Sequence, residues 1–179
     1  MIELTTDFQQ RAQAIKCVIF DVDGVLTDGK LFFDLNGQEY KSFHAQDGQG
    51  LKLLQQNGID VGIISGRSSP IVTRRMENLG VQHVYQGQEN KTAAFNDLLQ
   101  KLNLAPEQVA HVGDDLPDLA LMTRTRLAIA VHDANPSILP YCQGQTSRTG
   151  GHGAAREVCD AILSAQGKLE LAVRLFSDR

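Results

Sequence analysis

The sequence contains few of the residues that crosslink a chain or hold a metal through thiolates. It has three cysteines among 179 residues, at Cys17, Cys142 and Cys159, and no tryptophan. Three scattered cysteines are too few for a disulfide framework or for a zinc site with paired spacing. We therefore expect all three to be reduced thiols, in the core or at the surface.

Long apolar runs and an excess of positive charge are also missing. No apolar run reaches the length that crosses a bilayer, and the amino terminus lacks the basic-then-apolar pattern of a secretory signal. We therefore expect a cytoplasmic protein with no membrane partner. The formal net charge of −4 argues against a nucleic-acid partner, which would need a basic face. An anionic small-molecule ligand must then be held by a local group of cations.

The composition is that of an ordinary globular protein. With 179 residues, 42% hydrophobic and 21% charged, the chain is long enough for a sizeable core, and we expect one domain over residues 1–179. Apolar, strand-like segments alternate with segments of helical periodicity. This alternation predicts an α/β fold with a doubly wound, Rossmann-like, mostly parallel sheet. The expected strands cover residues 17–20, 60–65, 81–85, 108–112 and 127–131.

Two further segments carry extended patterns. Residues 30–43 predict a β-hairpin in which Asn36 and Gly37 supply the two positive φ angles of a type I′ turn. This hairpin is either a flap over a site or an extension at the edge of the main sheet. In the tail, residues 166–179, alternating apolar residues predict an extended segment that would dock on its own domain or on another subunit. The alternating residues are Leu169, Leu171, Val173 and Leu175.

The apolar run Cys17–Phe20 ends abruptly at two acidic residues, Asp21 and Asp23. Open α/β sheets bind their ligands at the carboxyl ends of the strands. Two carboxylates crowded there repel each other unless a positive charge lies between them, and a hard cation such as Mg²⁺ prefers oxygen ligands. Since Asp and Gly are also ordinary turn residues, the interpretation depends on the rest of the chain.

Matching residues follow in order along the sequence. Ser65 ends the second expected strand, Lys91 lies in the first turn of a helix, and Gly113-Asp114-Asp115 with Asp118 follows a later strand. A lysine at the positive end of a helix is unfavourable, which suggests an anion nearby. Together with Asp21-Val22-Asp23-Gly24-Val25-Leu26-Thr27-Asp28, these residues resemble the four motifs of the haloacid dehalogenase superfamily of phosphotransferases.

The resemblance implies a role for each motif residue. Asp21 would be the nucleophile and Asp23 the general acid and base. Ser65 and Lys91 would bind the phosphoryl group and balance its charge. The implied Mg²⁺ site consists of the Asp21 side chain, the Asp23 backbone carbonyl and Asp114, with Asp115 and Asp118 as outer support.

The intervals between the motifs are short. The first and second motifs, and then the second and third, are separated by only about forty and twenty-five residues, too few for the cap domain that many superfamily members insert there. We therefore expect a capless enzyme. A bare site would expose a phosphoenzyme to water, so a neighbouring subunit is expected to supply the missing walls.

Among capless members, the chain resembles the family of 3-deoxy-D-manno-octulosonate 8-phosphate (KDO 8-phosphate) phosphatases. The resemblance rests on the first motif, the hairpin, Ser65-Gly66-Arg67 and the ending at residues 150–157. It implies Mg²⁺ dependence, a homotetramer and a role in making the inner sugar of bacterial lipopolysaccharide. Because such a substrate carries a carboxylate, Arg67 and Arg75 are its expected partners, with Arg74 or Arg156 as alternatives.

Several other functions remain open from the residues alone. A phosphatase of nine-carbon sugar-acid phosphates would show nearly the same motifs. A signalling receiver module also phosphorylates an aspartate, but its acceptor lies on a mid-chain strand, whereas Asp21 and Asp23 follow the first core strand. A catalytically silent subunit is disfavoured because all the motif residues are present.

Two glycine-containing segments permit more than one interpretation. The Gly-x-Gly at 48–50 lacks the third glycine of a dinucleotide site, so we interpret Asp47 as the N-cap of the following helix. The glycines of residues 149–153 predict either a flexible connection or a loop that approaches a ligand closely.

Overall fold

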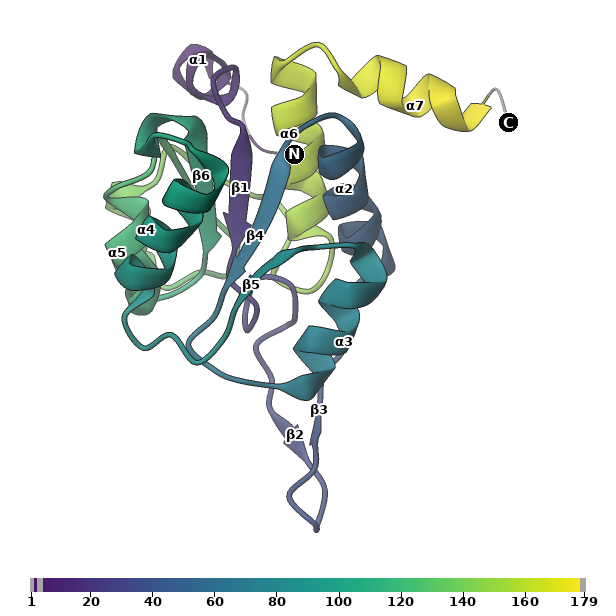
Figure 1. Ribbon diagram of the computed structural model, residues 1–179, viewed down its shortest axis with the longest axis vertical. Helices are drawn as coiled ribbons and strands as arrows, with labels where there is room; N and C mark the ends of the chain where they lie inside the picture. Colours follow the sequence, from purple (N-terminus) through teal and green to yellow (C-terminus); the bar gives the residue numbers. More distant parts are fainter. Residues whose placement is uncertain (1, 3–4, 178–179) are drawn as a thin grey trace.

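The computed structural model describes residue 2 and residues 5–177. Its main strands are β1 (Cys17–Phe20), β4 (Asp60–Ile64), β5 (His83–Tyr85), β6 (Val109–Gly113), β7 (Leu127–Ala130) and β8 (Gly144–Gln145). They form one sheet in the order β5-β4-β1-β6-β7-β8, in which every pair of neighbours is parallel (Figure 1). The predicted doubly wound parallel sheet is confirmed. The sequence pattern does not reveal β8, since two residues are too short to show a period.

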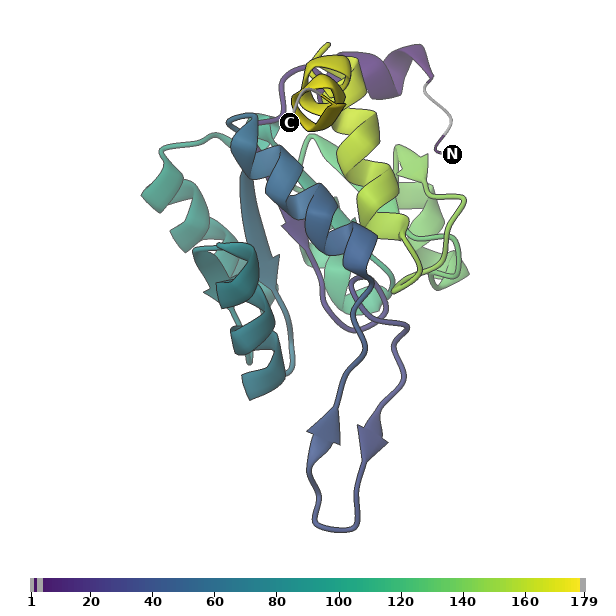
Figure 2. The ribbon, with the colours of Figure 1, turned by 90° about the vertical axis from the view of Figure 1, so that its right-hand side faces the viewer.

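Helices cover both faces of this sheet. They are α1 (Thr6–Ala12), α2 (Ala45–Gln56), α3 (Pro70–Leu79), α4 (Lys91–Leu102), α5 (Leu119–Met122), α6 (Ala154–Ala165) and α7 (Leu169–Ser177), with 3₁₀ turns at Pro106–Gln108, Leu116–Asp118 and Pro136–Tyr141. On one face lie α2, α3 and α6, and on the other α4 and α5 (Figures 1 and 2). In the part of the chain that the structure describes, no helix is long and apolar enough to cross a membrane.

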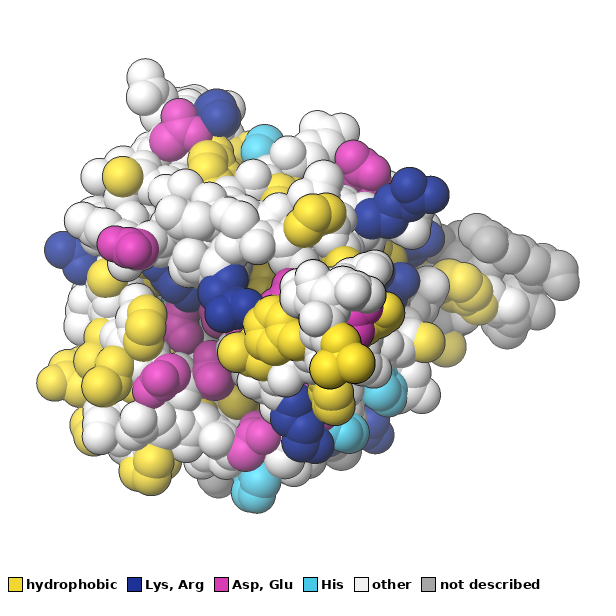
Figure 3. Space-filling model, turned by 90° about the horizontal axis from the view of Figure 1, so that it is seen from below, with side chains coloured by type: hydrophobic (Ala, Val, Ile, Leu, Met, Phe, Trp, Pro, Cys, Tyr) yellow, Lys and Arg dark blue, Asp and Glu magenta, His cyan; other side chains and the backbone are white. Residues whose placement is uncertain are grey.

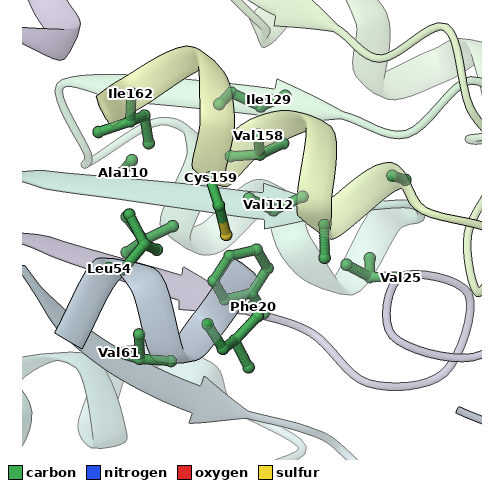
Figure 4. Packing of buried hydrophobic residues seen from close by; sticks show 14 of the residues in the cluster. Phe20, Val25, Leu54, Val61, Ala110, Val112, Ile129, Val158, Cys159 and Ile162 are labelled. Atoms are coloured by element: carbon green, nitrogen blue, oxygen red, sulfur yellow. The ribbon is translucent and has the colours of Figure 1, made fainter. Parts of the chain in front are cut away.

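The central strand β1 is buried on both sides. Val18 and Phe20 belong to the apolar cluster that includes residues of α2 and α6, whereas Cys17 and Ile19 belong to the cluster that includes residues of α4. An uninterrupted apolar run is typical of a parallel strand covered on both faces. Figure 4 shows the first cluster, where Phe20 lies close to Cys159 of α6. All three cysteines are free, as predicted.

The segment at 30–43 forms a separate antiparallel pair, β2 (Phe32–Phe33) and β3 (Glu39–Tyr40), which projects from the body of the molecule (Figure 2). It is therefore not an extension of the main sheet. The predicted type I′ turn is wrong, because Gly37 has a φ of +79° but Asn36 does not have a positive φ. Instead, Asp34 Oδ1 accepts hydrogen bonds from the backbone N–H groups of Asn36 and Gln38, at 2.9 and 2.8 Å. The Asp34 side chain thus stabilises a connection that is wider than a type I′ turn.

The tail differs from its predicted extended form. Residues Leu169–Ser177 are the helix α7, in which Ala172 is buried while Val173 and Phe176 are 55% and 48% exposed. The apolar residues of the segment fit two periods, since Leu169, Ala172, Val173 and Phe176 also follow the helical spacing i, i+3, i+4, i+7. The last two residues of the tail lie outside the described part of the chain.

Candidate active site

Three neighbouring strands end in polar residues at one edge of the sheet. Asp21 follows β1, while Ser65 follows β4 on one side and Asp114 follows β6 on the other. Ser65 is 3% exposed, and its backbone N–H donates to the carbonyl of Tyr85 at 2.9 Å. Seen from this edge, acidic side chains gather beside the projecting hairpin (Figure 3). This is the edge where a doubly wound sheet binds its ligand.

The chain turns sharply after Asp21. The carbonyl of Val22 accepts hydrogen bonds from the N–H groups of residues 25–27, at 3.3, 2.9 and 3.0 Å. Gly24 has a φ of +96°, and a Cβ at this position would lie 2.1 Å from Asp114 Oδ2. Only a glycine leaves room for the Asp114 carboxylate to approach the first loop so closely. The turn therefore brings the first and fourth motifs together.

Lys91 is the buried cation of the site. It begins α4 directly after the N-cap Asn90, whose side chain accepts a hydrogen bond from the N–H of Thr92. Its ammonium donates to Asp21 Oδ1 at 2.8 Å and to Asp118 Oδ1 at 2.7 Å. Burial alone would lower the pKa of Lys91, but the two carboxylates outweigh burial and raise it. The anions expected near this lysine therefore include the protein's own carboxylates.

Asp118 connects the lysine to the loop that follows β6. Its Oδ1 lies 2.9 Å from Nε2 of the fully buried His111, and its Oδ2 accepts hydrogen bonds from the N–H groups of Asp114 and Asp115, at 3.0 and 3.3 Å. Burial would raise the pKa of Asp118, but the hydrogen bonds and charges of His111 and Lys91 lower it. Because an ionised carboxylate only accepts, Nε2 of His111 carries the proton. Sequence reasoning missed His111, although a polar residue inside an apolar strand is a visible signal.

The cluster has the composition of a site for a hard divalent cation. Asp21, Asp114 and Asp118 bring carboxylate oxygens within 4.8 Å of one another. Burial, followed by the charge of Asp118, raises the pKa of Asp21 to about 6, and burial followed by the charges of Asp118 and Asp21 raises the pKa of Asp114 to about 8. A divalent cation would relieve this crowding. The exposed Asp115 turns elsewhere and accepts a hydrogen bond from Asn135 at 2.9 Å.

Asp23 lies among charged residues at the base of the hairpin. Its Oδ1 contacts the ammonium of Lys41, and its Oδ2 lies 3.7 Å from Nε of Arg67. Glu39 joins the two cations, since its Oε1 lies 3.3 Å from Nζ of Lys41 and accepts a hydrogen bond from Nη2 of Arg67 at 2.8 Å. Sequence reasoning missed Lys41 and Glu39, because charged residues in a hairpin are common and give no signal of their own.

The predicted arginines lie in different parts of the molecule. Arg67, with a side chain 46% exposed, is the one that reaches Asp23. The guanidinium of Arg75, on α3, lies 5.8 Å from the centroid of the Phe43 ring. The two alternatives are Arg74, also on α3, and Arg156, on α6.

The glycine-rich loop at 149–153 packs against the first motif. A Cβ at Gly150 would lie 1.7 Å from the backbone oxygen of Gly24, and the N–H of Gly151 donates to the carbonyl of Val25 at 3.0 Å. Glycine is needed here because two backbones meet without space for a side chain. These glycines therefore let the loop approach the backbone of the first motif closely.

Asp47 holds the helix that follows this loop. The prediction that it caps its own helix is wrong, since α2 begins two residues earlier and Asp47 lies inside its first turn. Its carboxylate accepts hydrogen bonds from the N–H groups of Gly153 and Arg156, at 3.2 and 2.7 Å. Asp47 therefore caps α6 and ties it to α2.

A parallel sheet with an aspartate pair after its first strand, and a lysine that bridges the first aspartate to an acidic loop, defines a phosphotransferase of the haloacid dehalogenase type. A family model described as haloacid dehalogenase-like hydrolase matches residues 38–123, and a model of sucrose-6F-phosphate phosphohydrolase matches residues 81–168. The 3-deoxy-D-manno-octulosonate 8-phosphate phosphatase KdsC of Escherichia coli (strain B / BL21-DE3) is 47% identical over 169 residues, which cover 94% of this chain and 90% of that protein.

Solved structures agree with this assignment. A probable YrbI family phosphatase from Pseudomonas syringae superposes with a TM-score of 0.94 at 49% identity, covering 96% of this chain and 98% of that one. The KDO 8-phosphate phosphatase of Moraxella catarrhalis, in complex with magnesium, phosphate and KDO, superposes with a TM-score of 0.91 at 41% identity, covering 94% and 97%. The chain belongs to the haloacid dehalogenase-like hydrolases, within the family of 3-deoxy-D-manno-octulosonate 8-phosphate phosphatases.

Proposed function

We propose that this protein hydrolyses KDO 8-phosphate to the free sugar acid and inorganic phosphate, with Mg²⁺, through an aspartyl-phosphate at Asp21. The observation that carries the proposal is the buried bridge from Lys91 to Asp21 and Asp118, at 2.8 and 2.7 Å. The bridge holds Oδ1 of Asp21, and we assign the attack on phosphorus to the other oxygen, Oδ2. The name of a curated relative that matches 94% of the chain supports the choice of substrate.

In the first half-reaction, Oδ2 of Asp21 attacks phosphorus, and the bond between phosphorus and the sugar oxygen breaks. Asp23 gives its proton to the departing oxygen, so the sugar leaves as an alcohol. Ser65 and Lys91 hold the oxygens of the phosphoryl group and balance its charge. The product on the enzyme is a mixed anhydride at Asp21.

In the second half-reaction, the now ionised Asp23 takes a proton from water. The oxygen of that water attacks phosphorus, the anhydride bond to Asp21 breaks, and inorganic phosphate leaves. Lys41 and Arg67 lie beside Asp23 during this step, with Lys41 in contact with Oδ1 and Nε of Arg67 3.7 Å from Oδ2. Asp23 then carries the proton for the next cycle.

The residues at this edge fit Mg²⁺. We assign its ligands to the Asp21 side chain, Asp114 and the Asp23 backbone carbonyl, with Asp118 and Asp115 supporting the loop around them. When bound, Mg²⁺ supplies positive charge to the phosphoryl oxygens. Burial and then the charges of neighbouring carboxylates raise the pKa of Asp21 to about 6 and that of Asp114 to about 8, in spite of the charge of Lys91. A divalent cation would offset both causes, which supports this assignment.

The carboxylate of the sugar acid needs a partner of its own. We assign that role to Arg67 and Arg75, since a guanidinium matches the planar geometry of a carboxylate. We further infer that the enzyme is a homotetramer in which a neighbouring subunit helps to enclose the site, with the hairpin as a flap. The corresponding place in the cell is the cytoplasm, in the synthesis of the inner sugar of lipopolysaccharide.

Phosphate release over a panel of phosphate esters tests the proposal. The panel contains KDO 8-phosphate, a nine-carbon sugar-acid phosphate and simple sugar phosphates, with and without Mg²⁺. We expect the highest kcat/KM with KDO 8-phosphate, and a loss of about 10⁴-fold or more in Asp21→Asn. A higher kcat/KM with the nine-carbon ester would transfer the assignment to that substrate. Activity retained by Asp21→Asn would remove this residue from the mechanism.

A further inference from the structure

The side chain of Lys41 is buried although the residue belongs to a projecting hairpin. Its side chain, directly after β3, is 1% exposed, whereas that of Lys30 at the other end of the hairpin is 69% exposed. A buried ammonium loses its hydration and is stable only where carboxylates compensate for that loss. Asp23 and Glu39, with side chains 18% and 15% exposed, provide the two carboxylates. The base of the hairpin is therefore fixed to a side chain of the proposed active site.

Lys41 also determines where the Asp23 carboxylate points. The hydrogen bonds of the first loop converge on the carbonyl of Val22 and fix the backbone, but a side chain can still rotate between staggered rotamers. Two cations flank the carboxylate. Arg67 Nε lies 3.7 Å from Oδ2, beyond hydrogen-bond distance, whereas Lys41 donates a hydrogen bond to Oδ1. Of the two cations, Lys41 is the one that holds the rotamer.

The direction of a general acid controls its effect. The acid must lie within hydrogen-bond reach of the leaving oxygen, and its proton transfer contributes about 10²- to 10⁴-fold to the rate. A displacement of about 1 Å can cost about 100-fold. A residue that fixes the carboxylate therefore affects the step in which the leaving oxygen is protonated.

We propose that Lys41 is a positioning residue, which ties the base of the hairpin to Asp23 and aims this carboxylate at the leaving oxygen of the substrate. The inference rests on the acid and base role proposed above for Asp23. Since Lys41 acts through Asp23, its loss must matter most for esters whose leaving oxygen needs a proton. A purely structural contribution of Lys41 would affect all esters alike.

The experiment compares two esters in the Mg²⁺-loaded enzyme and in Lys41→Met. KDO 8-phosphate releases an alcohol and needs an acid, whereas p-nitrophenyl phosphate releases a stable phenolate and needs little protonation. The ratio kcat/KM reports only the steps up to cleavage of the ester, so the shared second half-reaction drops out. We expect kcat/KM to fall about 10- to 100-fold for KDO 8-phosphate and less than about threefold for the aryl ester. Equal falls, or no fall with either ester, would overturn the inference.

Two variants serve as controls. Lys30→Met removes an exposed lysine from the same hairpin and is expected to leave both kcat/KM values unchanged. Lys41→Arg keeps a cation with hydrogen-bond donors and is expected to keep the wild-type ratio between the two esters. Thermal melting checks that each variant folds. If Lys41→Met does not fold, Lys41→Ala, which also removes the donor but leaves room for water beside the two carboxylates, is judged by the same ratio.

The two proposals fail in different ways. If the wild-type enzyme does not hydrolyse KDO 8-phosphate, the substrate assignment is wrong, and the comparison of leaving groups uses an alkyl phosphate that the enzyme does hydrolyse. Suppose instead that the wild-type enzyme is active and Asp21→Asn inactive, while Lys41→Met lowers kcat/KM equally for both esters. In that case only the inference on Lys41 is wrong.

Discussion

The carboxylate cluster and the hairpin lie at the same edge of the sheet but differ in burial and in the support that regular elements give them. In the cluster, the side chains of Asp21, Lys91 and Asp118 are 11%, 3% and 2% exposed, and each is placed by the end or start of a regular element. In the hairpin, Phe33 and Leu35 are 56% and 106% exposed, and each strand has two residues. A two-stranded hairpin is at best marginally stable by itself.

This difference suggests separate roles for the two regions, with the proposed catalytic groups on the sheet and the entry of substrate beside the hairpin. The sheet fixes the groups to which we assign the reaction, because parallel strands place their carboxyl ends side by side. The hairpin is joined to those groups through ion pairs at its base, which Lys41, Glu39 and Arg67 provide. We therefore expect changes in the cluster to affect catalysis and stability strongly, and changes at the tip of the hairpin to leave stability and the hydrolysis of simple esters nearly unchanged.

Loss of a metal ligand is expected to have the largest effect. In wild-type protein, Mg²⁺ at 100 times its Kd should add about 2.7 kcal/mol to the free energy of unfolding. Asp114→Asn should lose most of this stability increment, because one carboxylate ligand is missing. For the same reason its kcat/KM should fall by about 10³-fold or more. Urea unfolding with Mg²⁺ and with a chelator measures the increment, and Asp7→Asn on the exposed side of α1 is the control. An undiminished increment in Asp114→Asn would place the ion elsewhere.

Removing the bridging lysine is expected to affect stability most. Lys91→Met leaves Asp21 and Asp118 buried and facing each other, and the loss of one partner from a buried ion pair costs about 3–5 kcal/mol. Activity should fall about 10²- to 10³-fold, because the charge on the phosphoryl group is no longer balanced. Chemical unfolding and steady-state kinetics measure the two losses, with Lys101→Met on the same helix as control. If Lys91→Met were as stable as the wild-type protein, the expected difference in stability between the carboxylate cluster and the hairpin would be wrong.

A smaller effect is expected one layer deeper, at His111. His111→Phe keeps a ring of similar size but removes the hydrogen bond to Asp118, and a hydrogen bond to a charged group contributes about 1.5–3 kcal/mol. We expect a stability loss of that size and a roughly tenfold lower kcat. His132→Phe, at an exposed position, is the control. An unchanged kcat with lower stability would mean that His111 contributes to the stability of the core and not to catalysis.

The smallest effect is expected at the tip of the hairpin. Leu35→Ser replaces a fully exposed leucine, so the free energy of unfolding should change by less than about 0.5 kcal/mol, and hydrolysis of p-nitrophenyl phosphate should be unaffected. Unfolding at several protein concentrations provides the measurement. A larger loss that depends on concentration would mean that the tip packs on another copy of the chain.

The sheet and the positions of the motif residues could be predicted because their signals are local. Each buried strand is an apolar run, and Asp21, Ser65 and Asp114 follow directly where such a run ends. The topology then brings these ends together without further information. Lys91 was also recognisable, since a lysine in the first turn of a helix opposes the local dipole.

The partners of these residues could not be predicted, because they depend on tertiary contacts. Nothing in the sequence pairs Lys41 with Asp23, and the pairing of Asp47 with Gly153 joins residues 106 positions apart. The errors at α7 and at the hairpin turn have another cause. Short segments there are compatible with more than one backbone conformation, and packing or a side chain such as Asp34 decides between them.

The central claim is that Asp21 carries the phosphoryl group during turnover. Wild-type protein with Mg²⁺ and KDO 8-phosphate is quenched in acid during steady-state turnover and reduced with borohydride, which converts an aspartyl-phosphate into homoserine. Mass spectrometry of the peptide that contains residues 17–28 then locates the product. We expect homoserine at position 21 in the wild-type protein and none in Asp21→Asn. Homoserine at Asp23 or Asp114, or an unmodified peptide throughout active turnover, would contradict it.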